Sequence, residues 1–283
     1  MSNLKGHLYI VSTPIGNLGD ISQRAISVLQ TVDLIAAEDT RHSGKLLRHL
    51  SINTPCQAFH EHNERQKTAS LIQRLQNGES IALISDAGTP LLSDPGYHLV
   101  RAAHEQGIPV IPVPGASALL SALVAAGLPT DRFVFEGFLP NKQAARRTYL
   151  AGLEHETATL VFYEAPHRIL ATLQDMAEVL GEGREAVLAR ELTKTYETIR
   201  RDTLANLVSW VKQDSDQQRG EIVLVVAGAK AASDDELTPE TLRILKILLG
   251  DLSVKQAASM AAEITGQKKN RLYEAALKLN QDD

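Results

Sequence analysis

The sequence predicts an α/β protein with two α/β domains, a cleft between them and a small helical module at the C-terminal end. Short apolar segments typical of buried strands alternate with helical patterns along most of the chain, and glycine-bearing turns follow several of those strands. Beyond about residue 232 only helical patterns remain. We therefore expect domains at 1–128, with a mainly parallel sheet, and at 129–232, with a mixed sheet, followed by a helical module at 233–283.

Composition narrows the class of protein. The chain has 283 residues, which is long for a single core, and 43% of them are hydrophobic. A net charge of −5 argues against a uniformly basic nucleic-acid-binding surface but leaves room for local basic patches. The single cysteine, Cys56, cannot form an internal disulfide, and no run of about 18 apolar residues suggests a membrane helix. We therefore expect a cytoplasmic protein.

The first domain reads as repeated strand and helix units. The segment 81–84 is fully apolar, as expected at the centre of a parallel sheet, whereas Pro109 and Pro112 place the last strand at an edge or a bend. Asp20 is expected to cap the first helix, 21–30. Strands are expected at 7–12, 32–37, 56–59, 81–84 and 108–113, and the later helices end near residues 50, 76, 106 and 126.

The pattern restarts after a linker at 127–130. Strands are expected at 133–138, 159–163 and 221–228, with two more on either side of the charged segment 190–197, and helices after Pro140 and from Pro166 to Leu180. The segment 229–236 reads as a polar linker. Three helical patterns follow, at 238–249, 253–264 and 268–279, and a short glycine-containing turn typical of helix-turn-helix packing joins the last two.

Ionisable residues follow two strands of the first domain. Glu38, Asp39 and Arg41 follow the second strand, and His60 and Glu61 follow the third. Open parallel sheets bind ligands at the carboxyl ends of their strands, so these side chains are candidates for a site. Asp39 could equally cap the next helix. We predict no metal site, because His60 and His62 lack a zinc-binding spacing and a partner cysteine.

The residues alone predict a crevice lined by glycine-bearing turns, carboxylates, histidines and arginines, but no reaction. Several ordered segments nevertheless resemble the bacterial ribosomal RNA small-subunit methyltransferase I family, which belongs to the tetrapyrrole-methylase-like, class III S-adenosylmethionine enzymes. Thr13-Pro14-Ile15-Gly16-Asn17-Leu18 and Ser85-Asp86-Ala87-Gly88-Thr89-Pro90 carry the resemblance most clearly. The segments 37–41, 93–96, 114–118, 162–168, 189–194 and 220–221 extend it over nearly the whole chain.

The resemblance implies S-adenosylmethionine-dependent 2′-O-methylation of a cytidine ribose in 16S rRNA, on the small ribosomal subunit, by a homodimer. It places the cofactor between the two α/β domains. The implied cofactor-binding residues are Pro14, Asp86, Gly88, Thr89, Leu92, Ser117, Ala118, Tyr163, Val226, Ala227 and Gly228. Tetrapyrrole methylases proper open with a glycine-rich loop, whereas Thr13-Pro14-Ile15-Gly16 stands there in this sequence, which favours RNA over a porphyrinoid substrate.

A ribose 2′-hydroxyl is a poor nucleophile at neutral pH, so a general base is expected. We rank Asp39 or Glu38 first, followed by His60 and Glu61. The candidates for RNA binding are Arg41, Arg168 and Lys194, together with Lys268, Lys269 and Arg271 at the start of the final helix. Those last three could instead form the solvated face of a small bundle. Two other functions stay open: methylation of a small tetrapyrrole-like metabolite, and a non-enzymatic RNA-binding assembly factor.

Overall fold

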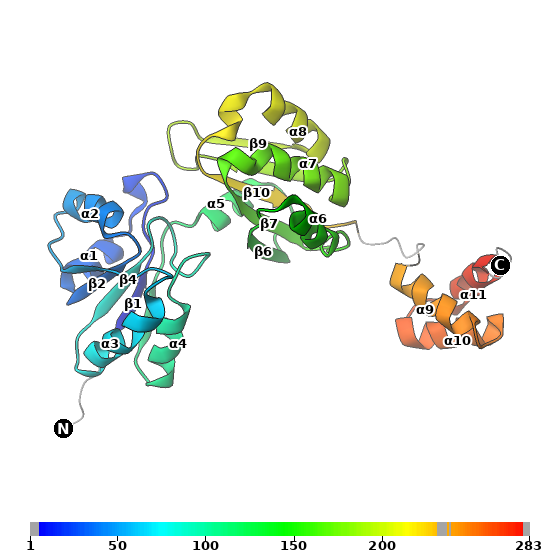
Figure 1. Cartoon of the computed structure of the whole chain (residues 1–283), viewed down its shortest axis with the longest axis horizontal. Helices are drawn as coiled ribbons and strands as arrows, with labels where there is room; N and C mark the ends of the chain where they lie inside the picture. The colour runs from blue at the N-terminus through cyan, green and yellow to red at the C-terminus, as the bar shows by residue number, and fades with distance from the viewer. Residues whose placement is uncertain (1–5, 231–236, 238, 280–283) are drawn as a thin grey trace. The chain divides into compact units, whose positions relative to one another are not determined.

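The computed structural model describes residues 6–230, 237 and 239–279. The chain divides into two compact units, Met1–Ala229 and Lys230–Asp283. The first unit contains two five-stranded sheets, and the second contains three helices (Figure 1). This architecture confirms the predicted fold class, whereas the boundary between residues 128 and 129 stays a prediction.

The first sheet is parallel throughout and has the order β3-β2-β4-β1-β5. β4 lies at its centre and is buried along its whole length, and β5, which contains Pro112, lies at one edge, as predicted. Because all five strands run the same way, their carboxyl ends meet at one edge of the sheet. The strands are β1 (Leu8–Val11), β2 (Leu34–Ala37), β3 (Cys56–Ala58), β4 (Ile81–Ile84) and β5 (Val110–Val113).

Helices cover both faces of this sheet. Alternate strand residues such as Leu34 and Leu83 pack against α3 and α4, and their neighbours Ile35 and Ile84 pack against α1 and α2. The helices are α1 (Gln23–Thr31), α2 (Thr40–His49), α3 (Glu64–Gln76) and α4 (Tyr97–Glu105). The expected cap of α1 is wrong. Asp20 belongs to a short 3₁₀ helix, η1 (Leu18–Asp20), and Ser22 caps α1 by accepting the Ala25 N–H.

The second sheet is mixed, as predicted, with the order β6-β7-β10-β8-β9. β6 and β7 are parallel, and the other neighbouring pairs are antiparallel. β10 therefore starts at the edge where β7 ends, which brings residues 220–222 close to Glu164. The strands are β6 (Phe133–Phe138), β7 (Thr159–Glu164), β8 (Glu185–Arg190), β9 (Thr198–Thr203) and β10 (Ile222–Val226).

One face of the second sheet packs against α6 (Gln143–Ala151), α7 (Ile169–Leu180) and α8 (Leu204–Gln213). α8 was not predicted, because it follows β9 directly, without a glycine or proline to mark the change, and begins at its Thr203 cap. The opposite face packs against α5 (Ala118–Ala125). Ile15, from the loop after β1, joins the same apolar cluster, so this loop of the first sheet packs against the second sheet. Two further 3₁₀ helices are η2 (Pro166–Arg168) and η3 (Ser215–Gln218).

The second unit is a bundle of α9 (Pro239–Leu249), α10 (Val254–Thr265) and α11 (Lys269–Leu279), as predicted. Leu245, Leu272 and small alanines of α10 form its core. Gly266, in the left-handed conformation at φ 71°, ends α10 and lets the chain turn into α11. The predicted linker 229–236 lies mostly outside the described residues. In the part of the chain that is described, no helix has both the length and the apolar character to span a membrane.

Candidate active site

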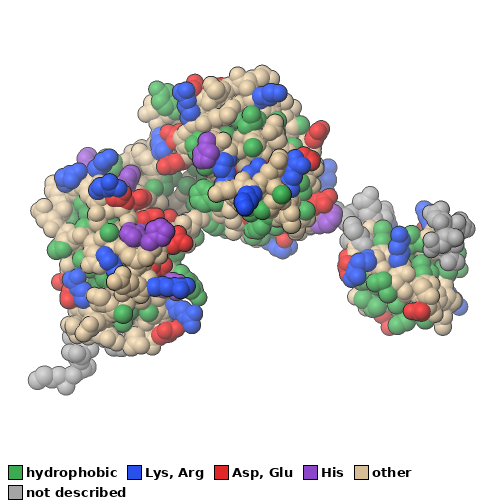
Figure 2. Space-filling model, viewed as in Figure 1, with side chains coloured by type: hydrophobic (Ala, Val, Ile, Leu, Met, Phe, Trp, Pro, Cys, Tyr) green, Lys and Arg blue, Asp and Glu red, His purple; other side chains and the backbone are tan. Residues whose placement is uncertain are grey.

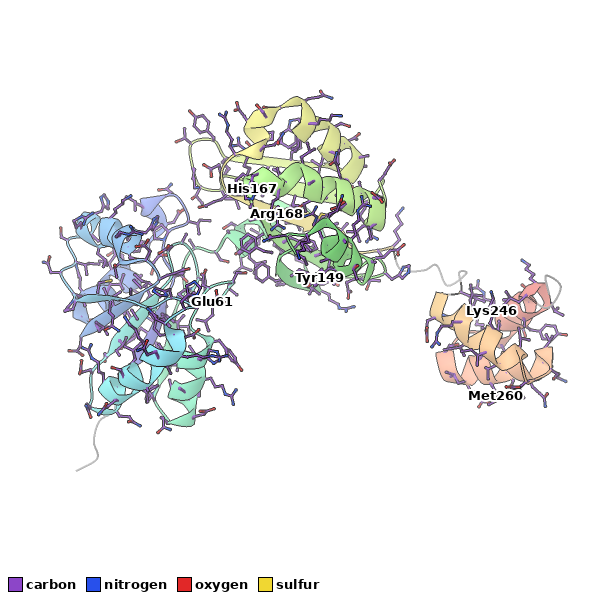
Figure 3. All side chains as sticks on the ribbon, viewed as in Figure 1. Glu61, Tyr149, His167, Arg168, Lys246 and Met260 are labelled. Carbon is purple, nitrogen blue, oxygen red and sulfur yellow. The ribbon has the colours of Figure 1, made fainter. Side chains whose placement is uncertain are left out.

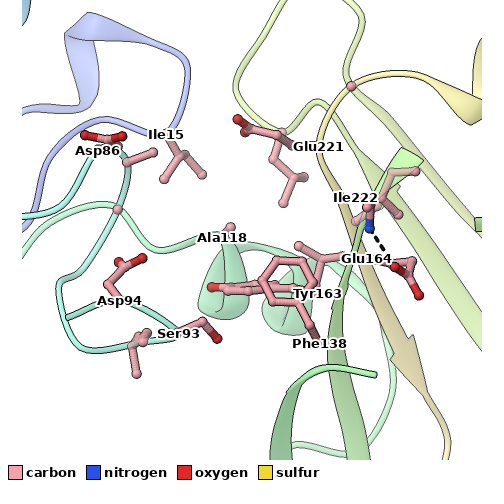
Figure 4. A pocket seen from close by; sticks show the side chains of 18 of the residues that line it. Ile15, Asp86, Ser93, Asp94, Ala118, Phe138, Tyr163, Glu164, Glu221 and Ile222 are labelled. Atoms are coloured by element: carbon pink, nitrogen blue, oxygen red, sulfur yellow. Dashed lines mark hydrogen bonds between the residues drawn. The ribbon is translucent and has the colours of Figure 1, made fainter. Parts of the chain in front are cut away.

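A cavity of about 450 Å³ lies where the carboxyl edge of the first sheet meets the second sheet (Figure 4). Its volume falls within the range of about 300–1,000 Å³ found for small-molecule sites. Loops after β2 and β4 form one wall, and strands β6, β7, β8 and β10 with their ends form the other. The lining residues are Ile15, Glu38, Asp86, Ala87, Gly88, Thr89, Leu92, Ser93, Asp94, Ala118, Phe138, Tyr163, Glu164, Ala165, Pro166, Ala189, Leu192, Gly220, Glu221, Ile222 and Val223.

Two carboxylates tie the first-sheet loops together. The Asp86 Oδ1 accepts the backbone N–H of Asp39 at 3.0 Å, and the Glu38 Oε2 accepts the backbone N–H of Asp86 at 3.4 Å. Burial raises the pKa of Glu38, and the negative charge of Asp86 adds to that effect, although the hydrogen bond from the Asp86 amide opposes it. The loops after β2 and β4 therefore hold acidic groups at fixed positions beside the cavity.

A third carboxylate, Asp94, enters the cavity from a strained loop. Leu91 and Ser93 both adopt left-handed backbone conformations, with φ 73° and 70°, which non-glycine residues rarely adopt. Figure 4 shows Asp94 on the same wall as Asp86, across from Tyr163. Burial raises the pKa of Asp94 to about 6, and the negative charge of Glu38 contributes to the shift. Asp94 is thus tuned to exchange a proton near neutral pH.

The second-sheet wall is mostly apolar. Phe138 and Tyr163 pack edge to face with ring centroids 5.7 Å apart, and Ala189, Leu192 and Val223 continue the surface. Burial raises the pKa of Tyr163, so its hydroxyl stays protonated and can donate a hydrogen bond. Beside the carboxylates of Glu164 and Glu221, which pair with Arg168 and Lys194, this wall offers stacking and shape to a flat ligand.

Glycines allow the close approach of the loops. Gly88 and Thr13 exchange backbone hydrogen bonds of 2.8 and 3.1 Å, which join the loops after β1 and β4. At φ 85°, Gly88 has a conformation that favours glycine, and a Cβ there would lie 3.2 Å from Ile15 Cγ2. A side chain at this position would push Ile15, which lines the cavity.

Comparison with known proteins identifies the family. A family model described as tetrapyrrole (corrin/porphyrin) methylases matches residues 7–208, and one described as the RsmI C-terminal HTH domain matches residues 235–280. The ribosomal RNA small subunit methyltransferase I of Pseudomonas aeruginosa is 60% identical over 96% of this chain and 97% of its own length. The protein of the same name from Escherichia coli O157:H7 is 57% identical over 97% and 96%. The chain belongs to the ribosomal RNA small subunit methyltransferase I family of tetrapyrrole methylases.

Solved structures of tetrapyrrole methylases share the fold. The uroporphyrin-III C-methyltransferase of Thermus thermophilus superposes with a TM-score of 0.56 at 21% identity, over 79% of this chain and 94% of its own. A diphthine synthase superposes with a TM-score of 0.60 at 14% identity, over 78% and 90%. Another structure of the Thermus enzyme, with a TM-score of 0.55 at 16% identity over 78% and 97%, is a complex with S-adenosylhomocysteine. Each of these likenesses shows the fold alone.

As a member of this family, the chain is an S-adenosylmethionine-dependent methyltransferase. The cavity fits that cofactor in its chemistry as well as its size. Ile15, Leu92 and Val223 would offer apolar surface to an adenine ring, and the acidic wall suits a sulfonium cation and hydroxyl groups. The predicted pocket thus has both an apolar and an acidic side.

Most of the predicted cofactor residues gather at this cavity: Asp86, Gly88, Thr89, Leu92, Ala118 and Tyr163 line it. Pro14 lines a neighbouring cavity instead, and Ser117 is buried as the cap of α5, where its Oγ accepts the Leu120 N–H. Val226, Ala227 and Gly228, which were expected to complete the pocket, do not line this cavity. β10 runs antiparallel to β7, so its carboxyl end lies at the opposite edge, and its first residues reach the cavity instead.

The residues predicted as general bases also differ in whether they line the cavity. Glu38 lines the cavity, whereas Asp39 does not. Asp39 caps α2 by accepting the Arg41 N–H at 2.7 Å, and its bond to the Arg41 side chain lowers its pKa. His60 and Glu61 also lie outside the lining, and Figure 3 labels Glu61 beside the first sheet. The contacts of Asp39 are therefore those of a helix cap, which was the alternative to a catalytic role.

The predicted RNA-binding residues differ in availability. The Arg41 side chain is 90% exposed, and Lys268 and Lys269 are exposed at the start of α11. Arg168 (Figure 3) binds Glu164, Asn141 and the Leu139 carbonyl, and Lys194 pairs with Glu191 and Glu221 at 2.7 and 3.2 Å. Arg271 is partly buried. Arg168 and Lys194 are therefore held by partners within the protein.

The residue that sequence reasoning missed as a functional candidate is Asp94. The segment 93–96 was used only as part of the family resemblance, although an aspartate in a proline- and glycine-bearing loop after a central strand is a usable signal. The prediction of the second-sheet wall was also incomplete, because it left out Phe138, Ala189 and the start of β10, which line the cavity. Their approach depends on the packing of two sheets, which no local pattern encodes.

Proposed function

We propose that this protein transfers a methyl group from S-adenosylmethionine to the 2′-hydroxyl of a cytidine ribose in 16S rRNA. The observation that carries the proposal is the cavity, where the half-buried carboxylates Glu38 and Asp94 face a largely apolar, aromatic wall. Near-full-length relatives at 57–60% identity are named as ribosomal RNA small subunit methyltransferases, which supports an RNA substrate. The absence of a glycine-rich turn after β1 supports the same choice.

Bound S-adenosylmethionine supplies an electrophilic methyl group on a positively charged sulfur. The protein must bring the ribose oxygen into line with that methyl carbon and accept the hydroxyl proton. Asp94 is the best-matched base, because its pKa of about 6 leaves it ionised yet basic near neutral pH. The oxygen–carbon bond forms as Asp94 takes the proton, and the carbon–sulfur bond breaks to leave S-adenosylhomocysteine. Glu38 is the second candidate for the base.

The other lining residues position the reactants. Asp86 is fixed by the Asp39 amide, so its free oxygen can accept a hydrogen bond from a cofactor hydroxyl. Tyr163 and Phe138 can stack on a flat ring and exclude water from the reacting atoms. In the most favourable cases, such positioning lowers the reaction barrier by about 7–11 kcal/mol.

Tritiated methyl transfer from S-adenosylmethionine to 16S rRNA tests the proposal. The substrate should be naked rRNA and intact small subunits, both from a strain that lacks the gene. We expect one methyl group per rRNA, on a 2′-oxygen. Alkaline hydrolysis should then fail to cleave the phosphodiester bond next to that oxygen. Failure to label either substrate would count against an rRNA methyltransferase, and label on a base would exclude the 2′-hydroxyl.

We further propose a cytoplasmic homodimer. α5 packs one side on the second sheet, and on its other side Leu120 and Val124 are 51% and 76% exposed, one helical turn apart. A second copy of the chain could cover such an apolar helix face. Val124→Glu should then shift the protein from dimer to monomer in sedimentation, whereas a wild-type protein that sediments as a monomer would refute the dimer.

A further inference from the structure

A second cavity adjoins the one described above. It has a volume of about 290 Å³ and lies between the loop after β1, the first turns of α2 and the loop after β4. Its lining residues are Pro14, Gly16, Leu18, His42, Ser43, Lys45, Leu46, Ser85 and Asp86. Asp86 lines both cavities, so a ligand in one lies next to a ligand in the other. We call this second space the α2 cavity.

An unpaired hydroxyl lines the α2 cavity. Ser43 is only 2% exposed, and its Oγ has no hydrogen-bond partner among the residues that the structure describes. Its own backbone N–H donates to the Asp39 carbonyl in the regular helical pattern, so the backbone is satisfied and only the side chain lacks a partner. Because a buried polar group without a hydrogen bond is costly, native proteins rarely keep one unless a ligand or water completes it.

Basic side chains line the α2 cavity beside this hydroxyl. His42 and Lys45 line the α2 cavity, are exposed, and form no ion pair with any described residue. Arg48 lies one turn beyond Lys45 on α2, Arg41 next to His42 pairs with Asp39, and Figure 2 shows basic side chains gathered over the α2 region. The one carboxylate in the lining, Asp86, already accepts the Asp39 amide. A hydroxyl donor beside the ammonium group of Lys45, which has no ion pair among the described residues, suits an oxyanion.

We propose that the α2 cavity binds one backbone phosphate of the RNA strand, next to the nucleotide whose ribose is methylated. Ser43 donates its hydroxyl hydrogen bond to a phosphate oxygen, Lys45 supplies the positive charge, and a ring N–H of His42 can donate a further hydrogen bond. This inference rests on the proposed rRNA substrate. A phosphate is favoured over the carboxylate of the cofactor because the cations stand exposed, where a long polyanion can reach them, and because the first cavity alone is large enough for the cofactor.

Two variants test the two kinds of contact. Ser43→Ala should weaken binding of 16S rRNA about tenfold or more, because a hydrogen bond to a charged group is lost. Its melting temperature should not fall, because the hydroxyl has no partner within the protein. Lys45→Gln should weaken binding and reduce the slope of log K against log salt concentration by about 0.7, the value for one phosphate contact on a single strand. Lys212→Gln, an exposed lysine on α8, is the matched control and should leave the slope unchanged.

The measurements are filter binding of unmethylated 16S rRNA at several salt concentrations and calorimetric titration with S-adenosylhomocysteine. Wild-type RNA affinity in both variants would overturn the inference, and so would a loss confined to S-adenosylhomocysteine binding, which would assign the α2 cavity to the cofactor. A fall in the melting temperature of Ser43→Ala would mean that the hydroxyl has a structural role. Failure of the proposed function is distinct, because the wild-type protein would then label no rRNA.

Discussion

The two sheets of the first unit hold their charged groups in different ways. At the edge of the first sheet, Glu38 and Asp94 line a cavity, have raised pKa values and form no ion pair with any residue that the structure describes. On the helices of the second sheet, Asp175 is fully buried and bonded to Arg146 at 2.6 Å and to Arg147 at 2.7 Å. Unpaired carboxylates are costly and suit chemistry, whereas paired ones hold helices together. On the proposed function, the first sheet would carry the reaction and the second would supply a rigid wall.

Asp94→Asn should have the largest effect. Asparagine keeps the shape of the side chain but cannot accept the proton, so kcat should fall about 10²- to 10⁴-fold. The dissociation constant of S-adenosylhomocysteine should stay within a few-fold of wild type, as measured by calorimetry. If single-turnover methyl transfer survives in this variant and is lost in Glu38→Gln instead, Glu38 is the base.

Asp175→Asn tests the paired carboxylate on the helices of the second sheet. The substitution leaves the buried Arg146 without its anionic partner, so the free energy of unfolding should fall by about 3–5 kcal/mol. The kcat of the folded enzyme, measured well below the melting temperature, should be unchanged. Glu178→Gln is the matched control, because Glu178 contacts only the exposed side of Arg147 and should cost much less. Equal losses in urea unfolding of the two variants would contradict a buried network.

These contrasts mark how far the sequence could predict the molecule. The apolar segment 81–84 and the prolines near 110 identified the centre and edge of the first sheet, because burial and hydrogen bonding constrain those residues locally. The direction of β10 was not readable, so residues 226–228 were assigned to the wrong edge. Partners were equally hidden: Arg41 and Arg168 look alike in sequence, yet Arg41 pairs with Asp39 at the exposed surface, whereas Arg168 is mostly buried against Glu164.

The pH dependence of kcat/KM and of folding stability should also distinguish the two groups of carboxylates. Because Asp94 must be ionised to act as a base, kcat/KM should rise about tenfold per pH unit below a pKa of about 6 and level off above it. Folding stability should change in the opposite direction. A raised pKa in the folded state favours the protonated form, so its contribution is present below about pH 4 and is lost as pH rises through about 6.

The difference between wild type and Asp94→Asn isolates that contribution. Chemical unfolding at pH 5 and pH 7.5 should show the variant gaining stability relative to wild type as pH rises. For Asp175 the sign is reversed. Burial acts to raise its pKa, but the bonds from Arg147, Gln143 and Arg146 outweigh that effect and keep the pKa low, so its contribution is lost only in acid. A variant of Asp94 that follows wild type at both pH values would show that its carboxylate is not buried in solution.

The smallest effect is expected at the arginines. Arg41→Ala removes a side chain that is 90% exposed, so the melting temperature should not change, but the salt slope of 16S rRNA binding should fall by about 0.7 if Arg41 contacts a phosphate. Arg168→Lys should do the reverse, because lysine cannot reproduce the contacts of the guanidinium with Glu164 and the Leu139 carbonyl. Its melting temperature should drop while the salt slope stays at the wild-type value. A reduced slope in Arg168→Lys would show that RNA reaches the second sheet as well, and the division of roles between the two sheets would then fail.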